Sequence, residues 1–209
     1  MIPGMSLLAF ALAAILLAVT PGPGMAYVVA RTVAGGRQEG FASCLGTGLG
    51  GMVHVVAAAL GLSLVVAQSA LAFNVVKFFG AAYLVYLGIR LLLRKERAFA
   101  PGPVASSGPR RALLEGVVVE VLNVKTALFF LAFLPQFVVP TEPLVPQLVL
   151  LGSVCVALNT LVDVVAVSAA HRLLASESAR AARARLLNRV SGVTLLGLGA
   201  WLALARRNA

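Results

Sequence analysis

Charged residues are scarce in this sequence. Only 11% of the 209 residues are charged, whereas 60% are hydrophobic and the mean hydropathy is +0.99. These values lie far outside the range of a soluble domain, so the sequence predicts an integral membrane protein. The formal net charge is +10, but apolar runs of membrane-spanning length separate the basic residues and no aromatic residues are interleaved with them. This pattern argues against nucleic-acid binding.

Cysteines and catalytic motifs are also sparse. The two cysteines, Cys44 and Cys155, lie in apolar surroundings without metal-ligand spacing, so they indicate neither a disulfide framework nor a metal site. The sequence contains no P-loop, no HExxH motif and no G-x-S-x-G nucleophile turn. We therefore expect a protein that is not an enzyme and that uses no cofactor.

Long apolar runs are what the sequence does contain. Stretches of about 20 such residues predict six transmembrane helices, at 5–29, 41–67, 72–93, 112–139, 144–170 and 187–205. The first run has no Lys or Arg before it and no clear cleavage site, so we expect it to be retained rather than removed as a signal. The predicted fold class is all-α integral membrane, with a single transmembrane domain over residues 1–209.

A linker divides this domain into two halves. Segment 94–111 is rich in Pro, Gly and Ser and joins half 1–93 to half 112–209. Three helices per half give the layout of two inverted three-helix repeats. Pro21 and Asn123 differ by 102 positions, as do Gly50 and Gly152. Chance also produces such matches in a glycine-rich chain, so the repeat is a hypothesis.

The positive charges predict the orientation, because short loops rich in Lys and Arg stay cytoplasmic. Thirteen of the 17 lie in alternate connections: Arg31, Arg37, Arg90, Arg94, Lys95, Arg97, Arg110, Arg111, Arg172, Arg180, Arg183, Arg185 and Arg189. We therefore expect a cytoplasmic linker and extracytoplasmic termini, although Arg206 and Arg207 argue the other way. Gly46 and Gly50 have the spacing of closely packed membrane helices, which serves internal packing or a homodimer.

The stretch TPGPG, residues 20–24, interrupts a run that carries no charge from Met1 to Ala30. Pro21, Gly22, Pro23 and Gly24 predict a break in the first helix, where irregular backbone lines a cavity. The competing interpretation is a kink that only fits the helix to its neighbours.

Polar side chains within the later apolar runs complete the candidate site. They are Glu120, Asn123 and Lys125 in 112–139, Asn159 and Asp163 in 144–170, and His54 in 41–67. Charges at such depth normally face a partner or a wet cavity. Asn159 and Asp163 are four residues apart and share a helix face, and Asp163 is the favoured proton-exchanging group. His54 is explained most simply as an imidazole hydrogen-bonded within the bundle.

The segments TPGPGMAYVVARTVAGGRQEGFASCLGTGLGGMVH, FNVVKFFGAAYLVYLGIRLLL and NVKTALFFLAFLPQFVVP resemble the LysE/RhtB family of amino-acid exporters. The resemblance runs over essentially the whole chain in order. Family members usually have Asn-Pro-Lys where this chain has Asn123-Val124-Lys125, which leaves open whether helix 112–139 breaks there. The family's frequent Asp after Gly50 is Gly51 here.

The resemblance implies export of amino acids or related small metabolites across a bacterial inner (plasma) membrane by a secondary transporter that the proton-motive force drives. The half-helix after TPGPG would bind the substrate carboxylate with help from Lys125, which alternatively pairs with Glu120. Asp163 or Glu120 would exchange the substrate ammonium for a proton. Two alternatives stay open: a membrane thiol-redox carrier that uses Cys44 and Cys155, and a metal-cation efflux protein, for which soft ligands are lacking.

Overall fold

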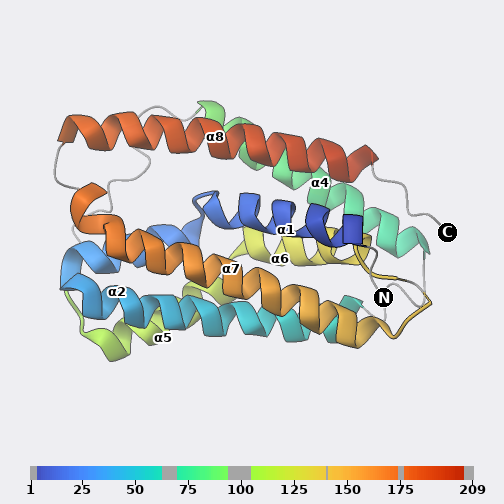
Figure 1. Ribbon diagram of the computed structural model, residues 1–209, viewed down its shortest axis with the longest axis horizontal. Helices are drawn as coiled ribbons and strands as arrows, with labels where there is room; N and C mark the ends of the chain where they lie inside the picture. The colour runs from blue at the N-terminus through green and yellow to red at the C-terminus, as the bar shows by residue number, and fades with distance from the viewer. Residues whose placement is uncertain (1–3, 63–69, 94–104, 140, 174–176, 205–209) are drawn as a thin grey trace.

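Every regular element in the part of the chain that the structure describes is a helix. A computed structural model describes residues 4–62, 70–93, 105–139, 141–173 and 177–204. The elements are α1 (Gly4–Val19), α2 (Pro23–Ala57), the π-helix η1 (Ala58–Leu62), α4 (Ala70–Leu93), α5 (Pro109–Val121), α6 (Val124–Phe133), the 3₁₀ turn η2 (Leu134–Gln136), α7 (Leu144–Leu173) and α8 (Glu177–Leu204). They form an elongated bundle (Figure 1). The predicted all-α class is confirmed.

The helices have the composition of a membrane protein, but the predicted number of spans stays a prediction. Two described stretches, Pro23–Gly61 and Leu144–Ala169, are long and apolar enough to cross a membrane. The bent pair of α5 with α6 and η2 gives a third if it counts as one span. Helix breaks are one reason for the lower count, because they divide predicted spans into shorter pieces.

The first break confirms the prediction made from TPGPG. α1 ends at Val19 and α2 begins at Pro23, so the predicted span 5–29 consists of two helices. Gly22 is the extended N-cap of α2, and Pro23 stands in its first turn, where the missing N–H would have no intrahelical partner. Proline and glycine thus end one helix and start the next within three residues.

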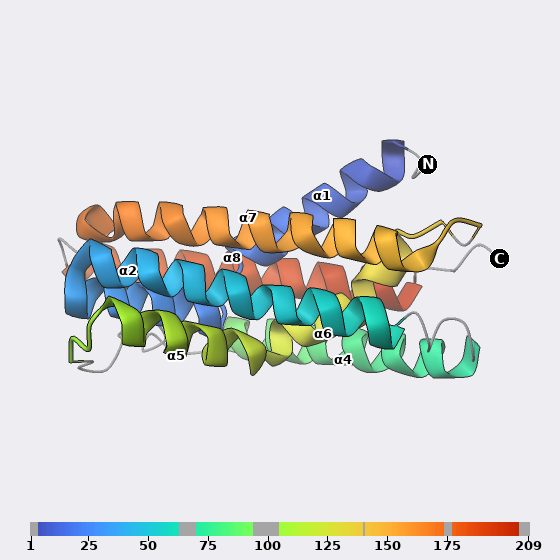
Figure 2. The ribbon, with the colours of Figure 1, turned by 90° about the horizontal axis from the view of Figure 1, so that it is seen from below.

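α2 itself bends at Gly36, which the sequence analysis did not predict. Gly36 has a φ of +73° and a ψ of −167°, a backbone conformation that is essentially restricted to glycine. We call residues 23–35 the α2 N-segment and residues 37–57 the α2 C-segment. Figures 1 and 2 show α2 folding back on itself at this bend. The predicted connection between the first two spans is therefore almost entirely helical.

A second break separates α5 from α6, even though the expected proline is replaced by Val124. The two helices meet at an angle of 47°. Asn123 is the N-cap of α6, and its side-chain oxygen accepts a hydrogen bond from the Lys125 backbone N–H at 3.1 Å. Asparagine is among the best N-cap residues, so it starts a new helix without help from proline.

Glycines hold the α2 C-segment close to α5. A Cβ atom on Gly46 would collide with the Leu113 carbonyl oxygen, and one on Gly50 would lie 2.7 Å from the Val117 carbonyl oxygen. A Cβ on Gly116, from the α5 side, would lie 3.0 Å from the Ser43 carbonyl oxygen. The predicted packing role of the glycines is confirmed, and this glycine seam joins the two helices as one unit.

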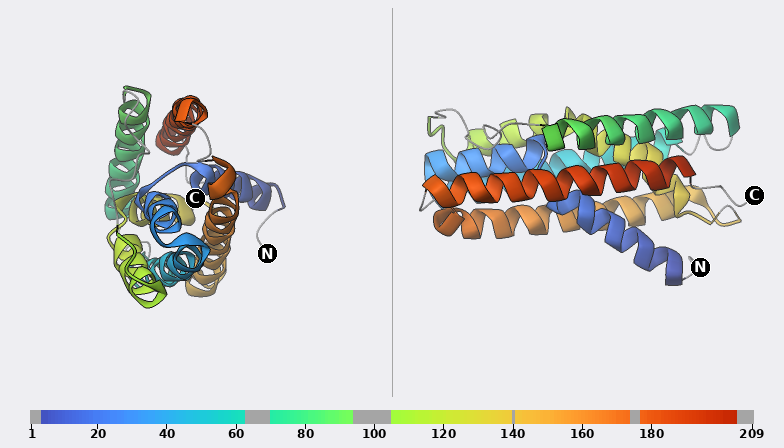
Figure 3. Two further views of the ribbon diagram at one scale, coloured as in Figure 1. Left: turned by 90° about the vertical axis from the view of Figure 1, so that its left-hand side faces the viewer. Right: turned by 90° about the horizontal axis from the view of Figure 1, so that it is seen from above.

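Aromatic rings stack at one side of the largest apolar core: the buried Phe10, Phe129, Phe133 and Phe137 and the partly exposed Trp201, which we call the aromatic cluster. The ring centroids of Phe129 and Phe133 lie 4.7 Å apart, and those of Phe133 and Trp201 lie 5.3 Å apart. Phe133 thereby joins α6 to α8, and Phe137, which follows η2, contacts Phe10 of α1. Figure 3 shows α8 running beside α4 while α1 projects from the bundle at an angle.

The charged connections gather at one end of the bundle. The bend at Gly36, the start of α5 and the ends of α7 and α8 that face each other across residues 174–176 all lie there, and we call it the Gly36 end (Figure 1). α1 begins and α8 ends at the opposite end. One detail differs from the prediction: α8 starts at Glu177, so Arg180 to Arg189 are helical rather than part of a loop. Which end faces the cytoplasm stays a prediction.

Candidate functional site

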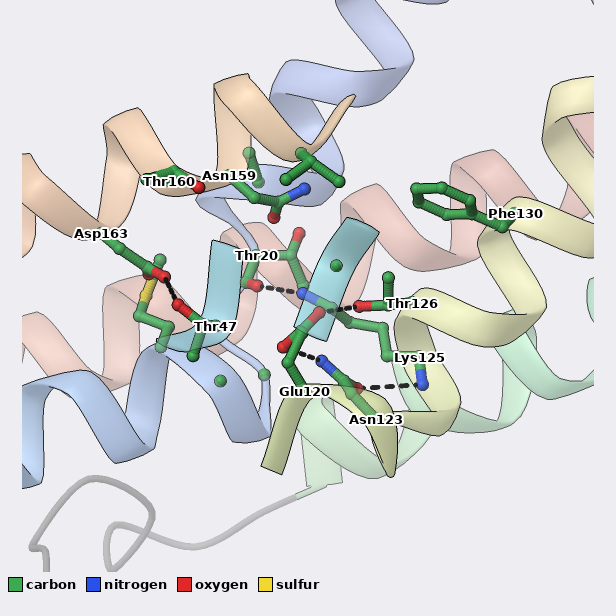
Figure 4. Close-up of a pocket in the computed structure, with 16 residues that line it drawn as sticks. Thr20, Thr47, Glu120, Asn123, Lys125, Thr126, Phe130, Asn159, Thr160 and Asp163 are labelled. Atoms are coloured by element: carbon green, nitrogen blue, oxygen red, sulfur yellow. Dashed lines mark hydrogen bonds between the residues drawn. The ribbon is translucent and has the colours of Figure 1, made fainter. Parts of the chain in front are cut away.

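A pocket lies where the two helix breaks meet, with walls from α1, the α2 segments, α5, α6 and α7 (Figure 4). Seven of the ten candidate residues from the sequence line it: Gly22, Gly24, Glu120, Asn123, Lys125, Asn159 and Asp163. Pro21 and Pro23 form the break beside it and are not among the lining residues, and neither is His54. The fold thus brings residues from both halves of the chain to one place, and their part in transport stays a prediction.

Lys125 reaches across to the end of α1. Its ammonium donates hydrogen bonds to the carbonyl oxygens of Thr20 at 2.7 Å and Leu17 at 3.2 Å. The last carbonyls of a helix lack intrahelical partners and carry the negative end of the helix dipole, so they suit a cation. Gly22 makes room for this contact, because a Cβ there would lie 2.9 Å from Lys125 Cε and Nζ. The lysine side chain therefore joins the two broken helices.

Glu120 points toward the other side of the first break, the start of α2. It lies in the last turn of α5, and a Cβ on Gly24 would collide with its Oε2. Oε1 accepts a hydrogen bond from the Thr126 hydroxyl at 2.6 Å, and Oε2 accepts one from Asn123 Nδ2 at 3.0 Å. Both carboxylate oxygens thus have donors, and the positive end of the α2 dipole is close by.

The two charges are therefore matched to the two helix ends at the first break. The ammonium lies at the carbonyl end of α1, and the carboxylate lies at the N–H end of α2. In this structure the recorded partners of the Lys125 ammonium are carbonyl oxygens, so the alternative pairing of Lys125 with Glu120 is not the contact adopted. The start of α2 has no side-chain cap, so its first N–H groups are available to another acceptor.

Asp163 is the least satisfied charged group in the pocket. It is 7% exposed, and Thr47 Oγ1 lies 3.3 Å from its Oδ2. The same hydroxyl lies 3.0 Å from the Cys44 carbonyl oxygen and has only one hydrogen to donate. Asn159, one turn away on α7, donates to the Cys155 carbonyl oxygen at 3.0 Å. Asp163 is therefore the acid with the most capacity to accept a new donor.

His54 contacts the backbone at the break between α5 and α6. Its Nε2 lies 2.8 Å from the Glu120 carbonyl oxygen, at the open end of α5, and its ring centroid lies 6.1 Å from that of Phe130. This is the simpler of the two predicted interpretations, an imidazole that is hydrogen-bonded within the bundle.

The sequence analysis missed the hydroxyl groups of the pocket. Four threonines line it, namely Thr20, Thr47, Thr126 and Thr160. Their signal was weak, because a threonine in a membrane helix commonly bonds to its own backbone, as Thr20 does to the Leu16 carbonyl oxygen at 2.7 Å. Adjacency was the available clue: Thr126 follows Lys125, and Thr160 follows Asn159.

The geometry offers little to the metal and thiol alternatives. Among the described residues, no group of three or more His, Cys, Asp or Glu side chains is placed to hold a metal ion. Cys44 and Cys155 are both free and buried, and they belong to different apolar clusters. In these positions both cysteines pack as small apolar residues.

Comparison with known proteins identifies relatives along nearly the whole chain. An uncharacterized membrane protein of Vibrio cholerae serotype O1 is 31% identical over 205 residues, which cover 95% of this chain and 97% of that protein. The homoserine/homoserine lactone efflux protein of Salmonella typhimurium is 31% identical over 201 residues, or 95% and 96% of the two chains. The leucine efflux protein of an Enterobacter species is 29% identical over 133 residues, 62% of each chain. No solved structure matches the chain.

A family-level comparison agrees with these pairwise similarities. The profile of the family described as "LysE type translocator" matches residues 15–206, which include both helix breaks and every pocket residue discussed above. The chain therefore belongs to the LysE family of translocators.

Proposed function

We propose that this protein exports amino acids or closely related small metabolites from the cytoplasm across the bacterial inner membrane. As a member of a translocator family it is a transporter rather than an enzyme. Two of its relatives are named as efflux proteins, one for homoserine and homoserine lactone and one for leucine. The observation that carries the proposal is the pocket between two broken helices, which offers both an acid and a free helix start to a zwitterion.

The substrate carboxylate would bind at the start of α2. Gly22, Gly24 and Met25 line the pocket there, and no side chain caps the helix. Free N–H groups and the positive end of the dipole suit an anion. Lys125 would contribute its third N–H, since two are directed to carbonyl oxygens.

The substrate ammonium would bind to Asp163. This carboxylate is buried and has one shared hydroxyl as its recorded donor. Release of the ammonium would leave a carboxylate that a proton neutralises, which couples efflux to proton entry. Glu120 is the less suitable partner, because both of its oxygens already accept hydrogen bonds.

Alternating access would then move the two halves about this pocket. α1 with the α2 N-segment, and α5 with α6, are both helices interrupted near their middle, which supports an inverted repeat. The positive charge at the Gly36 end supports a cytoplasmic position for that end and extracytoplasmic termini. In this arrangement the chain would cross the membrane six times. A homodimer is compatible with the exposed apolar faces.

The test is efflux from cells preloaded with amino acids through dipeptides. Expression of the protein should accelerate efflux of one amino-acid group, and collapse of the proton gradient should abolish the effect. Lys125→Ala and Asp163→Asn should each reduce efflux at least tenfold at equal membrane abundance, because each removes a group held ready for the substrate. Exposed Arg37→Gln is the matched control. Full proton-coupled efflux by Asp163→Asn would remove that residue from the mechanism.

A further inference from the structure

A second polar cluster lies between the pocket and the Gly36 end. It consists of Arg31 and Tyr27 on the α2 N-segment, Glu39 on the α2 C-segment and Glu115 on α5, and we call it the Arg31 cluster. Arg31 and Glu39 are only 5% and 2% exposed. Glu115 precedes the pocket residue Glu120 by five positions, a rise of about 7.5 Å along the helix. The cluster is thus one to two turns from the pocket.

Arg31 is the centre of these contacts. Its guanidinium forms an ion pair with Glu115, lies 3.7 Å from Glu39 Oε2 and donates to the Ala105 carbonyl oxygen at 3.2 Å. Nε of Arg31 donates to the Tyr27 hydroxyl at 3.1 Å, and that hydroxyl donates to the Ala112 carbonyl oxygen at 2.9 Å. The α2 N-segment is therefore fastened to α5 and to the residues before it by polar contacts.

Glu39 belongs to the other side of this junction. Its Oε1 accepts hydrogen bonds from the Ser106 hydroxyl at 2.5 Å, the Ser107 N–H at 3.0 Å and the Gly108 N–H at 2.8 Å, at the very start of α5. The glycine seam fixes the rest of the α2 C-segment to α5 as well. The C-segment, Glu39 and α5 consequently form one body.

The α2 N-segment is bounded by two irregular points of the backbone, one toward that body and one toward α1. Gly36 is at one end of it, in a conformation that other residues rarely adopt, and the break at Thr20 to Gly22 is at the other end. Among the residues that the structure describes, the apolar cluster beneath it has three buried members, Val28, Cys44 and Val167. The Arg31 cluster and this apolar cluster are thus the described contacts that hold the segment at the Gly36 end.

We propose that the α2 N-segment is the gate between the pocket and the Gly36 end, and that Arg31 is the latch that keeps it closed. The segment carries the pocket residues Gly24 and Met25 at one end and Arg31 near the other, so its displacement opens the pocket wall. A buried ion pair gains little over its hydrated charges, so water replaces the Arg31 contacts on opening with a small change in free energy. The inference rests on the proposed function only in taking the pocket as the transport site.

The test measures how fast a thiol reagent reaches the pocket. In a background with Cys44→Ala and Cys155→Ala, Thr160→Cys places a single thiol in the pocket wall. A membrane-impermeant methanethiosulfonate is applied to right-side-out or inverted vesicles, and Arg110→Cys at the exposed start of α5 identifies which side the Gly36 end faces. Arg31→Gln should accelerate labelling of the pocket thiol about tenfold from that side alone, as a shift of the gate equilibrium by one factor of ten requires.

Arg37→Gln, an exposed arginine six residues further along α2, should leave the rate unchanged. Unchanged labelling in Arg31→Gln, or equal acceleration from both sides, would overturn the proposal. If Arg31→Gln does not reach the membrane, Glu115→Gln removes the opposite charge and must give the same one-sided acceleration. Efflux from cells that express the same variants separates the two hypotheses. If Arg31→Gln gives one-sided acceleration of labelling but no variant or parent exports an amino acid, the exporter proposal is refuted. If the parent exports amino acids but Arg31→Gln leaves labelling unchanged, the gate proposal is refuted.

Discussion

The two ends of the bundle enclose the same pocket by different kinds of contact. At the Gly36 end, the Arg31 cluster lies beside an apolar cluster that has three buried members among the described side chains. Toward the opposite end, four phenylalanines of the aromatic cluster belong to a core that has 21 buried members among the described residues. Water can replace an ion pair at little net change in free energy, but a buried ring has no such substitute. We therefore expect opening at the Gly36 end to cost less free energy than opening at the aromatic end.

The largest effect on this comparison is expected from separating the α2 C-segment from α5, the two helices against which the α2 N-segment closes. Gly46→Leu inserts a side chain where even a Cβ meets the Leu113 carbonyl oxygen, so the glycine seam cannot form. We expect the folded protein to disappear from membranes, as measured by fluorescence-detected size exclusion. Gly197→Leu is the control, because a Cβ at Gly197 meets nothing within 4 Å. Normal levels of Gly46→Leu would show that the seam is not rigid.

The second-largest loss of stability is expected from a substitution in the aromatic cluster. Phe133 is fully buried between Phe129 and Trp201, so Phe133→Ala should lower the free energy of unfolding by about 3–5 kcal/mol. Thermal unfolding in detergent measures this loss. Phe79→Ala, which truncates a ring that is 73% exposed, should change stability little. Equal losses in the two variants would contradict the packed character of this end.

A smaller loss of stability is expected from a substitution at the break between α5 and α6, which lies between the two ends. Asn123 caps α6, which carries the aromatic cluster, and donates to Glu120 on α5. Asn123→Ala should therefore cost about 1–2 kcal/mol, from the lost cap and the lost hydrogen bond together. Asn123→Ser, which keeps a capping oxygen, should recover part of this loss in the same unfolding assay. No difference between the two variants would show that the cap is not what starts α6.

The smallest effect belongs to a single hydroxyl at the Gly36 end. Tyr27→Phe removes contacts to Arg31, Glu115 and the Ala112 carbonyl oxygen but keeps the ring. We expect a loss of about 0.5–1.5 kcal/mol and retained efflux, because a single hydroxyl contributes a modest net amount and Arg31 keeps its ion pair with Glu115. A loss as large as that of Phe133→Ala would mean that the two ends do not differ in kind.

The sequence predicted the breaks in the helices better than their bends. Proline and glycine at TPGPG specify a break directly, since they remove a donor and weaken the helix. At Asn123 the family resemblance marked the position but its proline was missing, and capping chemistry supplied the break instead. The bend at Gly36 was missed because counting apolar runs treats a charged stretch as a loop, whereas this stretch remains helical on both sides of one glycine.

Charge counting had a related weakness at Arg31. The residue was counted among the solvated cations of a connection, but it is buried because Glu39 and Glu115, from two other segments, surround it. Such partners are distant in sequence, so no local pattern reveals them. The same reason explains why Thr47 was missed, since its hydroxyl becomes part of a site only when α7 brings Asp163 to it.

The bond between Lys125 and the end of α1 also sets an order of assembly. Thr20 and Lys125 are 105 residues apart, so the carbonyl end of α1 enters the membrane long before its partner exists. At ordinary rates of synthesis the delay is roughly 5–20 s. During that interval the open end of α1 needs water or lipid headgroups as donors, because hydrocarbon offers none. We therefore expect α1 to settle at its final depth only after α6 has been inserted, which makes the first helix to be synthesised one of the last to be fixed.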